Sequence, residues 1–366
     1  MSALFRSKTK SYLGIDLGAG GIKVVELRAM DGKGNLITYG FSDRAPDEIG
    51  TDYLDNAEET GGLLQKICKA ARTTTLQAVT ALPIPAVFSA VLSIGAVPKK
   101  ELPAAVQWEA KKLIPLPLEE VVLDWRILSK EEGGKAAAKT EGQEEPAKEK
   151  TMEVLLTAAP KSIIEKYVVI AKMAGLTLAS LETESFALIR ALLGSDPTPT
   201  ILLDIGALRS NILIIDRGIP FLTRSLEIGG KRCTEVVAAS LQVSLDRAEE
   251  IKRDLSSTPL PGTTPGELPA VFEDIFAPLI NEIKYSVNVY RTRNTVARMP
   301  ERIIFTGGGS TLPGLTEFFE SKFNIRAFRG NPWERVQYHQ DLVPLLQDLG
   351  PKFSVAIGLA LRNLSH

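Results

Sequence analysis

The fold of this chain is decided by residues 13–27, which read LGIDLGAGGIKVVEL. Two apolar, β-rich runs flank a glycine-rich turn, and this pattern indicates a β-hairpin rather than a strand followed by a helix. Residues 202–215, LLDIGALRSNILII, repeat the order of strand, Asp-x-Gly-Ala turn and strand. Asp16 and Asp204 occupy equivalent positions about half the chain apart. The repeat predicts two related domains that each open with the same hairpin.

The composition is that of an ordinary globular protein. The chain has 366 residues, a length that suits two domains. Its 44% hydrophobic and 24% charged residues exclude a collagenous, coiled-coil or wholly disordered chain. A formal net charge of -1 argues against nonspecific binding to nucleic acid, which needs a net basic surface. Because neither a transmembrane stretch nor a signal peptide is evident, we expect a cytoplasmic protein.

Cysteine and histidine are too scarce for several kinds of site. Cys68 and Cys233 lie far apart without C-x-x-C spacing, so neither a disulfide framework nor a thiolate metal site is indicated. The two histidines, His339 and His366, argue against hydrolase triads and histidine-held metals. Carboxylates, lysines and glycine-rich turns remain as the groups that could carry chemistry.

Hydrophobic periodicity predicts an alternation of helices and strands. Before the second hairpin, the expected helices cover 61–72, 103–112, 161–174 and 185–193, and the expected strands cover 79–82, 87–94, 121–128, 153–158 and 178–181. After it, helices are expected at 234–241, 245–255, 271–293, 315–323 and 354–364, and a strand at 302–305. This mixture predicts an α/β fold.

Composition also indicates the domain limits. Residues 1–195 form the first expected domain, which contains an inserted small subdomain at about 77–160. Residues 130–150 hold eleven charged residues and predict a flexible, solvated loop within that subdomain. A proline-rich link then leads to the second expected domain, 196–366, whose residues 256–270 contain four prolines and predict a loop.

The two turns suit phosphate, because glycine lets backbone N–H groups approach a ligand closely. Gly18 to Gly21 is neither a Walker loop nor a dinucleotide fingerprint, since no Gly-Lys-Ser/Thr follows and a strand stands where a helix would begin. Two such turns across a cleft could grip a polyphosphate, with Asp16 and Asp204 holding Mg²⁺ through waters. The alternative is two tight turns whose aspartates cap their own backbones.

Two further segments could contact a nucleotide. Residues 306–310, TGGGS, follow a strand and would let a base or an α-phosphate approach bare backbone. Glu249 and Lys252 lie on one helix face, where they could bind ribose hydroxyls. The alternative for this pair is an ion pair on the protein surface.

In this order the motifs resemble the actin-like ATPase superfamily, which includes actin, the large heat-shock chaperones, sugar kinases and FtsA. The resemblance implies two actin-like, RNase H-like domains with ATP and Mg²⁺ in the cleft between them. Residues 182–193 and 354–361 would be the two connecting helices, with Ala356 and Gly358 allowing close packing. The implied nucleotide contacts are Asp16, Gly18, Ala19, Gly20, Gly21, Lys23, Asp204, Gly206, Ala207, Asn211, Glu249, Lys252, Arg253, Gly307, Gly308, Gly309 and Ser310, with Asp16 and Asp204 serving the metal.

Within that superfamily the chain resembles the PilM family of type IV pilus assembly proteins. Residues 109–121, EAKKLIPLPLEEV, carry this likeness most specifically, together with residues 184–188 and 331–333. The likeness implies an FtsA-like inserted subdomain and a cytoplasmic, ATP-binding scaffold that captures the N-terminal tail of the inner-membrane protein PilN. It implies further partners in the pilus machinery (motor ATPases, the platform protein), a role in twitching motility and only indirect membrane contact. It leaves the homo-oligomeric state open.

One departure from the family pattern concerns turnover. The first turn has Ala19-Gly20-Gly21 where relatives place hydroxyl side chains, so backbone amides and Lys23 would have to hold the phosphates. Only Glu182 or Glu184 stands near the place of the usual catalytic residue, so we assign no catalytic residue and expect at most a slow ATPase. The alternatives are a small-molecule kinase and an FtsA-like division protein, the latter disfavoured because residues 363–366 bring no C-terminal amphipathic helix.

Overall fold

The computed structural model describes residues 10–30, 32–95, 97–130, 151–293 and 298–364. It divides into two compact units: a main unit of Met1–Ile84 with Lys166–His366, and a small unit of Pro85–Glu165. Most of the charged loop expected at 130–150 lies outside the described residues. The limits expected for the two large domains stay predictions.

The first expected hairpin lies in a six-stranded sheet of the main unit, in the order β14-β3-β2-β1-β4-β8. Its strands are β1 (Ser11–Gly18), β2 (Gly21–Met30), β3 (Lys33–Phe41), β4 (Gln77–Leu82), β8 (Thr177–Thr183) and β14 (Val336–Gln337). β1 and β2 are antiparallel, with Gly18 opposite Gly21 at the turn and Asp16 opposite Lys23. We call the part built on this sheet the first domain.

The second hairpin lies in a five-stranded sheet, in the order β11-β10-β9-β12-β13. Its strands are β9 (Thr200–Ile205), β10 (Ser210–Asp216), β11 (Ile219–Leu226), β12 (Arg302–Thr306) and β13 (Arg326–Arg329). Asp204 stands opposite Asn211 in the antiparallel β9–β10 pair. We call the part built on this sheet the second domain, and the predicted repeat of the hairpin is confirmed.

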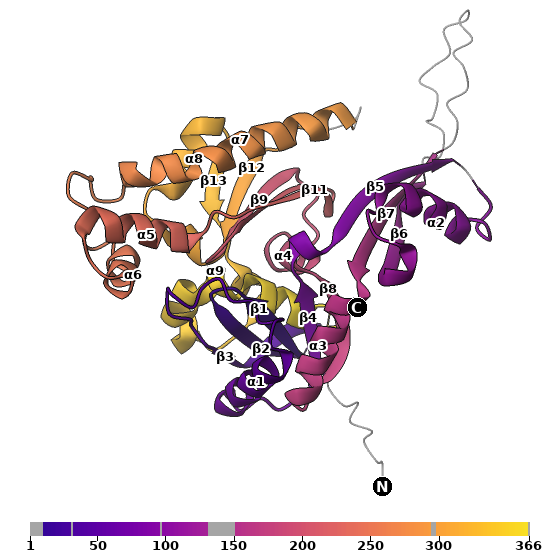
Figure 1. The fold of residues 1–366 in the computed structure, drawn as a ribbon, viewed down its shortest axis with the longest axis horizontal. Coiled ribbons are helices and arrows are strands. Elements are labelled where there is room, and N and C mark those ends of the chain that lie inside the picture. Colours follow the sequence, from indigo (N-terminus) through magenta and orange to yellow (C-terminus); the bar gives the residue numbers. More distant parts are fainter. Residues whose placement is uncertain (1–9, 31, 96, 131–150, 294–297, 365–366) are drawn as a thin grey trace, which may run out of the picture. The chain divides into compact units, whose positions relative to one another are not determined.

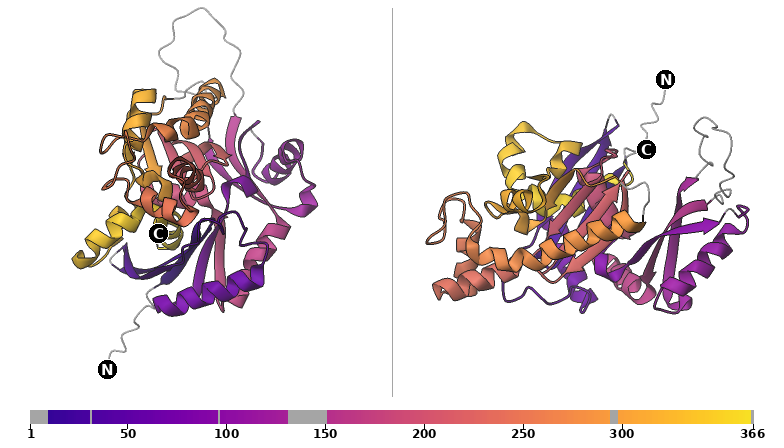
Figure 2. Two further views of the ribbon diagram at one scale, coloured as in Figure 1. Left: turned by 60° about the vertical axis from the view of Figure 1, so that its left-hand side comes forward. Right: turned by 90° about the horizontal axis from the view of Figure 1, so that it is seen from above.

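The helices form layers around the two sheets, as Figures 1 and 2 show. α4 (Glu184–Leu192) and α9 (Val343–Leu361) lie between the sheets, where Leu188 and Leu359 join the same core as Val79 of the first sheet and Leu202 of the second. α1 (Ala57–Ala71) and α3 (Lys161–Met173) cover the outer face of the first sheet. The outer face of the second sheet is covered by α5 (Gly230–Leu241), α7 (Ala270–Arg293) and α8 (Leu315–Phe323), and α6 (Leu245–Arg253) packs on α5.

Two glycines allow α9 to approach its neighbours backbone to backbone. A Cβ at Gly358 would lie 1.9 Å from the carbonyl oxygen of Ala187 in α4. A Cβ at Gly14 in β1 would lie 2.0 Å from the carbonyl oxygen of Ala356. Real Cβ atoms do not come that close, so both positions require glycine. The close packing expected of Ala356 and Gly358 is confirmed.

The small unit is a three-stranded antiparallel sheet in the order β5-β7-β6. Its strands are β5 (Phe88–Gly95), β6 (Val121–Lys130) and β7 (Thr151–Pro160), and α2 (Leu102–Leu113) packs on one face. Leu102, Val106 and Ala110 of α2 share a core with Val154 and Leu156 of β7. Pro103 lies in the first turn of α2, as the sequence predicts.

Several elements differ from expectation. The closing helix, expected from residue 354, begins at Val343, because Pro344 lies in its first turn and the helix continues through Pro351. β3 and β11 were not predicted, since each contains glycine or proline among its apolar residues. The expected turn at 306–310 becomes a short 3-10 helix, Gly308–Thr311. No helix among the described residues is long and apolar enough to cross a membrane.

Candidate functional site

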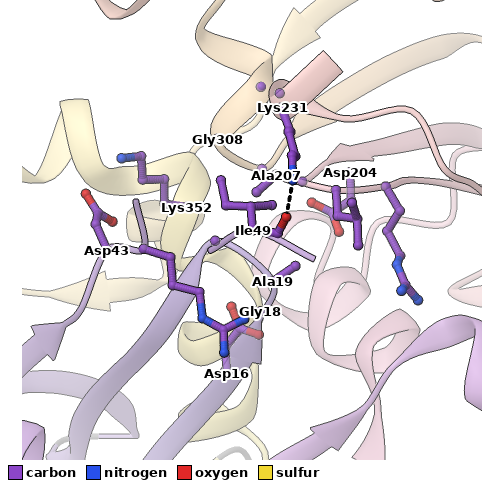
Figure 3. Close-up of a pocket in the computed structure, with 18 of the residues that line it drawn as sticks. Asp16, Gly18, Ala19, Asp43, Ile49, Asp204, Ala207, Lys231, Gly308 and Lys352 are labelled. Carbon is purple, nitrogen blue, oxygen red and sulfur yellow. Dashed lines mark hydrogen bonds between the residues drawn. The ribbon is translucent and has the colours of Figure 1, made fainter. Parts of the chain in front are cut away.

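A cavity of about 450 Å³ in the main unit is lined by both hairpin turns. The segment 42–56, which connects β3 with α1 and which we call the strap, contributes to its wall. The start of α5, the middle of α9, the end of α6 and the turn after β12 also line it, as do Pro83, Glu184 and Glu227. Figure 3 shows Ala19 and Ala207 reaching this space from different hairpins. Turns far apart in the sequence thus meet at one cavity.

The first turn pairs a carboxylate with a lysine. Lys23 Nζ lies 3.8 Å from Asp16 Oδ2 and donates to the carbonyl oxygen of Gly21 at 3.0 Å. A Cβ at Gly18 would lie 3.1 Å from the same Nζ, so glycine makes room for the lysine. Lys23 is held beside the turn rather than extended into solvent, which suits a cation that contacts phosphate.

The second turn pairs its carboxylate with a neutral amide. Asn211 Nδ2 donates to Asp204 Oδ2 at 3.2 Å. The amide N–H of Gly206 donates to the carbonyl oxygen of Arg209 at 2.9 Å and closes the turn. The start of α5 is fastened to it, since the backbone N–H groups of Gly230 and Lys231 donate to the carbonyl oxygens of Gly206 and Ala207.

The two turns face each other closely. A Cβ at Gly20 would lie 2.9 Å from Cβ of Ala207. The domains therefore touch at their turns, with the cavity beside the contact. The prediction that both turns bind one polyphosphate requires them to lie on the same cavity, and they do.

Three carboxyl groups line the cavity with raised pKa values. Burial raises the pKa of Asp16, although Lys23 opposes the change. Burial and the repulsion from Asp16 raise the pKa of Asp204 to about 6, although the hydrogen bond from Asn211 opposes the change. Glu184, at the start of α4, has its pKa raised to about 8 by burial and by repulsion from both aspartates. Such a group of carboxyls favours a cation among them.

A divalent cation would need ligands besides these carboxylates. No group of three or more His, Cys, Asp or Glu side chains is close enough to hold a metal directly, so far as the described residues go. Mg²⁺ commonly keeps waters and binds through one or two carboxylates plus phosphate oxygens. The donor set therefore fits a metal that arrives with a phosphorylated ligand.

The α5–α6 wall holds a closed polar network. Glu249 Oε2 accepts from Thr234 Oγ1 at 2.6 Å and from Lys252 Nζ at 2.5 Å, and Oε1 accepts from Arg253 Nε at 2.8 Å. Although burial opposes it, the charge of Lys252 and these hydrogen bonds lower the pKa of Glu249 to about 2. The pair of Glu249 and Lys252 thus lines the cavity and is not the surface ion pair weighed as the alternative.

The glycine turn after β12 lies against the second hairpin. Gly307 has φ +78°, and a Cβ there would lie 2.4 Å from the carbonyl oxygen of Ile205. Its N–H donates to the carbonyl oxygen of Pro351 in α9 at 3.0 Å. Gly308 lies against the side chain of Lys352, as Figure 3 shows. Bare backbone thus borders the cavity at this turn.

The structure brings most of the predicted contacts to this cavity. The lining includes Asp16, Gly18, Ala19, Gly20, Lys23, Asp204, Gly206, Ala207, Asn211, Glu249, Lys252, Arg253, Gly307, Gly308 and Gly309. Gly21 and Ser310 are not part of it. Gly21 has φ +138° and would clash with the carbonyl oxygen of Ser42 if it had a Cβ, and the buried hydroxyl of Ser310 donates to the carbonyl oxygen of Gly307. These two residues shape the backbone.

The two glutamates considered for catalysis have different places. Glu182 is bound by Arg190, whose guanidinium makes hydrogen bonds of 2.6 and 2.9 Å to its two oxygens, and it is absent from the lining. Glu184 lines the cavity and accepts from the N–H of Ile84 at 3.0 Å. Of the two, only Glu184 could contact a ligand.

Other lining residues were not predicted. Asp43, Arg44 and Ile49 come from the strap, Lys231 from the start of α5 and Lys352 from α9. No local motif marks them, because their proximity arises only when the domains fold together. Ile49 and Tyr53 are apolar residues within a polar stretch, and they were the available indication in the sequence that the strap is packed against the protein.

Comparisons with known proteins agree with this architecture. A family model described as type IV pilus assembly protein PilM matches residues 14–364. A solved structure described as the PilM–PilN type IV pilus biogenesis complex contains a chain 27% identical to this one, with a TM-score of 0.77, and the match covers 96% of this chain and 98% of that chain.

More distant structures share the fold. The ethanolamine utilization protein EutJ from Carboxydothermus hydrogenoformans is 17% identical, with a TM-score of 0.51 over 96% of this chain and 89% of its own. MreB5 of Spiroplasma citri bound to ADP is 14% identical, with a TM-score of 0.50 over 96% of this chain and 95% of its own. The predicted actin-like fold of two domains is confirmed. The chain belongs to the PilM family of type IV pilus assembly proteins.

Proposed function

We propose that this pilus assembly protein binds ATP with Mg²⁺ in the cavity between its two hairpin turns. The observation that carries the proposal is the meeting of two glycine turns from two domains at one cavity, beside carboxyls whose pKa values are raised by burial and by mutual repulsion. MreB5, which shares the fold, has been solved with ADP bound, and this supports the proposal.

Residues of both domains would contact the ligand, each group binding a different part of it. Backbone N–H groups of the turns at Gly18–Gly20 and Gly206–Ala207, together with Lys23, would hold the phosphates. Asp16 and Asp204 would bind Mg²⁺ through its waters, and the bound metal would offset the charge of the triphosphate. The glycines at 307–309 would lie beside the nucleoside, because no side chains stand in the way there.

Nucleotide would act chiefly as a conformational ligand. Glu184 is the one glutamate of the two candidates at the cavity, and a carboxyl with a pKa of about 8 is mostly protonated at neutral pH. A protonated carboxylic acid is a poor general base, so we expect slow turnover at most. Nucleotide that touches both domains favours whichever domain arrangement it binds best.

We further propose that the protein captures the N-terminal cytoplasmic tail of a PilN-type inner-membrane protein. The supporting observation is the 27% identical chain in the PilM–PilN complex, 98% of which is covered by the match. Exposed apolar side chains in the small unit, namely Trp108, Leu113 and Leu116, are candidate contacts for such a tail. Through it the protein would sit at the inner membrane and meet the motor ATPases and platform protein.

A pull-down with a synthetic tail peptide tests both proposals together. The peptide is immobilised and the full chain is applied with and without Mg-ATP. We expect retention that changes with Mg-ATP for the wild type, a change that is lost in Asp204→Ala, and a change that needs more Mg-ATP in Asp16→Ala. Asp246→Ala, an exposed aspartate of α6 outside the cavity, is the matched control.

The outcomes separate the two proposals. No retention of the wild type under either condition would contradict tail capture. Retention that ignores Mg-ATP, with no binding of ATP in a separate equilibrium titration, would contradict the nucleotide proposal and leave the capture of the tail intact.

A further inference from the structure

The strap, residues 42–56, is an ordered segment rather than a loose connection. The N–H groups of Ser42 and Arg44 donate to the carbonyl oxygens of Ile22 and Gly20, which anchors the start of the strap to the first hairpin. The guanidinium of Arg44 lies 3.6 Å from the ring centroid of Tyr53 and donates to the carbonyl oxygen of Thr51. These contacts hold its two ends together.

The far end is fixed to α1. Thr60 Oγ1 donates to the carbonyl oxygen of Tyr53 at 2.7 Å, and the side chain of Asn56 caps the helix by accepting from the N–H of Glu59. Ile49, Tyr53 and Leu54 are each less than a tenth exposed. The strap therefore has a definite shape that it keeps by its own contacts.

Two side chains of the second domain bind this strap across the cavity. Lys231 Nζ, at the start of α5, donates to the carbonyl oxygen of Ile49, as the dashed line in Figure 3 shows. Arg253 Nη1, at the end of α6, lies 3.6 Å from Asp43 Oδ2. The strap belongs to the first domain, so both contacts join the two domains, and the one at Ile49 lies close to Ala207 of the second turn.

The two contacts differ in expected strength. The Lys231 hydrogen bond is charge-assisted and partly buried, which makes it the stronger. Arg253 and Asp43 are 54% and 35% exposed in their side chains, so solvent screens their attraction. The strap is thus held chiefly at Ile49.

We propose that the strap is the gate for the nucleotide, held shut by Lys231 and, more weakly, by Arg253. A ligand enclosed between the turns, the α5–α6 wall and the strap leaves when the strap separates from the second domain. The inference rests on the proposed function, because it names the element that controls exchange of that same ligand. If the strap is the gate, the rate of nucleotide release depends on two contacts that lie outside the phosphate turns.

Dissociation of a fluorescent ATP analogue tests this gate. The full chain is loaded with mant-ATP and Mg²⁺, then mixed with excess ATP in a stopped-flow instrument. Lys231→Met keeps the aliphatic length but removes the donor, and we expect roughly tenfold faster release. Asp43→Asn tests the weaker contact from the strap side, with about twofold faster release expected. Arg232→Met on the same helix, whose exposed partner is Glu235, should release like the wild type.

Hydrogen exchange of the nucleotide-free protein distinguishes a gate from a direct ligand contact. Lys231→Met should raise exchange in peptides covering 43–54, whereas Arg232→Met should not. Faster release with unchanged strap exchange would mean that Lys231 contacts the ligand itself, and would overturn the gate. Unchanged release from Lys231→Met and Asp43→Asn would overturn it as well.

Failure of the proposed function gives a different result. A wild-type protein that binds no mant-ATP at all would overturn nucleotide binding and the gate together. Binding by the wild type with release insensitive to both variants would overturn the gate alone.

Discussion

The two hairpins present equivalent aspartates to one cavity with different partners. Asp16 faces a lysine, Lys23, whose ammonium is 3.8 Å away. Asp204 faces Asn211, whose amide donates at 3.2 Å but carries no charge. The first carboxyl thus has an ammonium beside it, whereas the second has a neutral amide as its hydrogen-bond partner and feels Lys23 only as a more distant charge. The duplicated motif thus places two equivalent carboxyls in different electrostatic surroundings.

A second difference lies two residues before each aspartate. Gly14 lies against the backbone of α9, whereas the equivalent Leu202 is a fully buried core side chain. The same helix packs side chains against both sheets, but at these two equivalent positions it meets backbone at Gly14 and a side chain at Leu202. The first hairpin therefore tolerates no added volume at this position.

The largest effect is expected from breaking that packing difference. Gly14→Ala would place a Cβ about 2 Å from the Ala356 oxygen, and we expect it to lower the free energy of unfolding by more than about 3 kcal/mol. Gly62→Ala in α1 has open space for its Cβ and should raise that free energy by about 0.5–1 kcal/mol. Urea denaturation of both variants measures the contrast. A mild effect of Gly14→Ala would mean that α9 can shift away from β1.

The next effect concerns the shared carboxyls. A carboxyl whose folded pKa is raised binds more protons in the folded state, so its contribution to stability falls as pH rises from its unfolded to its folded pKa. For Glu184 this window runs from 4.5 to about 8. Glu184→Gln should therefore raise the free energy of unfolding by about 2 kcal/mol near pH 9 and leave it unchanged near pH 4.

Thermal or urea unfolding across pH checks this window. Mg²⁺ with nucleotide should flatten the pH dependence of the wild type, because a bound cation favours ionised carboxyls. A wild type whose stability did not fall between pH 5 and about 8 relative to Glu184→Gln would contradict the proposed repulsion.

A smaller effect sharpens the comparison of the two aspartates. Asp204→Asn should weaken Mg-ATP binding by roughly 10- to 100-fold, because it removes the carboxyl whose hydrogen-bond partner is a neutral amide. Asp16→Asn should weaken binding by only a few-fold, on the order of half a decade, since it also frees Lys23 for the phosphates. Isothermal titration of both variants decides the order. An equal or greater loss in Asp16→Asn would contradict this ranking of the two aspartates.

The smallest effect is expected from Lys352. Its ammonium makes no salt bridge within the described part of the chain, and burial lowers its pKa. Lys352→Met should reduce nucleotide affinity by about threefold, since the lysine borders the cavity beside Gly308. The effect is small because the charge of Lys352 is also attracted by Asp43. The exposed Lys66→Met in α1 serves as the control in the same titration.

Local sequence was enough to predict the parts of the fold that rest on local geometry. The hairpins follow from glycine and aspartate between apolar runs, and the capped or proline-started helices followed from their ends, as at α2. The early half of α9 was missed, since Pro344, Gly350 and Pro351 read as helix breakers when the tertiary packing that supports them is unknown.

The site was predictable where it consists of glycine turns and not where it consists of long side chains from other elements. Ala19, Ala207 and Gly308 lie at the cavity because the motifs themselves make turns. Lys231 and Asp43 reach it only because α5 and the strap meet across two domains, and that meeting has no signature in either segment alone. Ser310, predicted as a nucleotide contact, is absent from the lining, because its hydroxyl donates to the carbonyl oxygen of Gly307 in its own turn.

The hydrogen bond from Gly307 to Pro351 ties a turn that lines the cavity to the helix between the sheets. Farther along the same helix, Ala356 and Gly358 touch β1 and α4 without intervening side chains. Between this turn and the first domain there are thus no side chains at these contacts whose rotamers could absorb a displacement. Even a shift of the turn well below the size of a methyl group would have to move the helix and the first domain as rigid bodies.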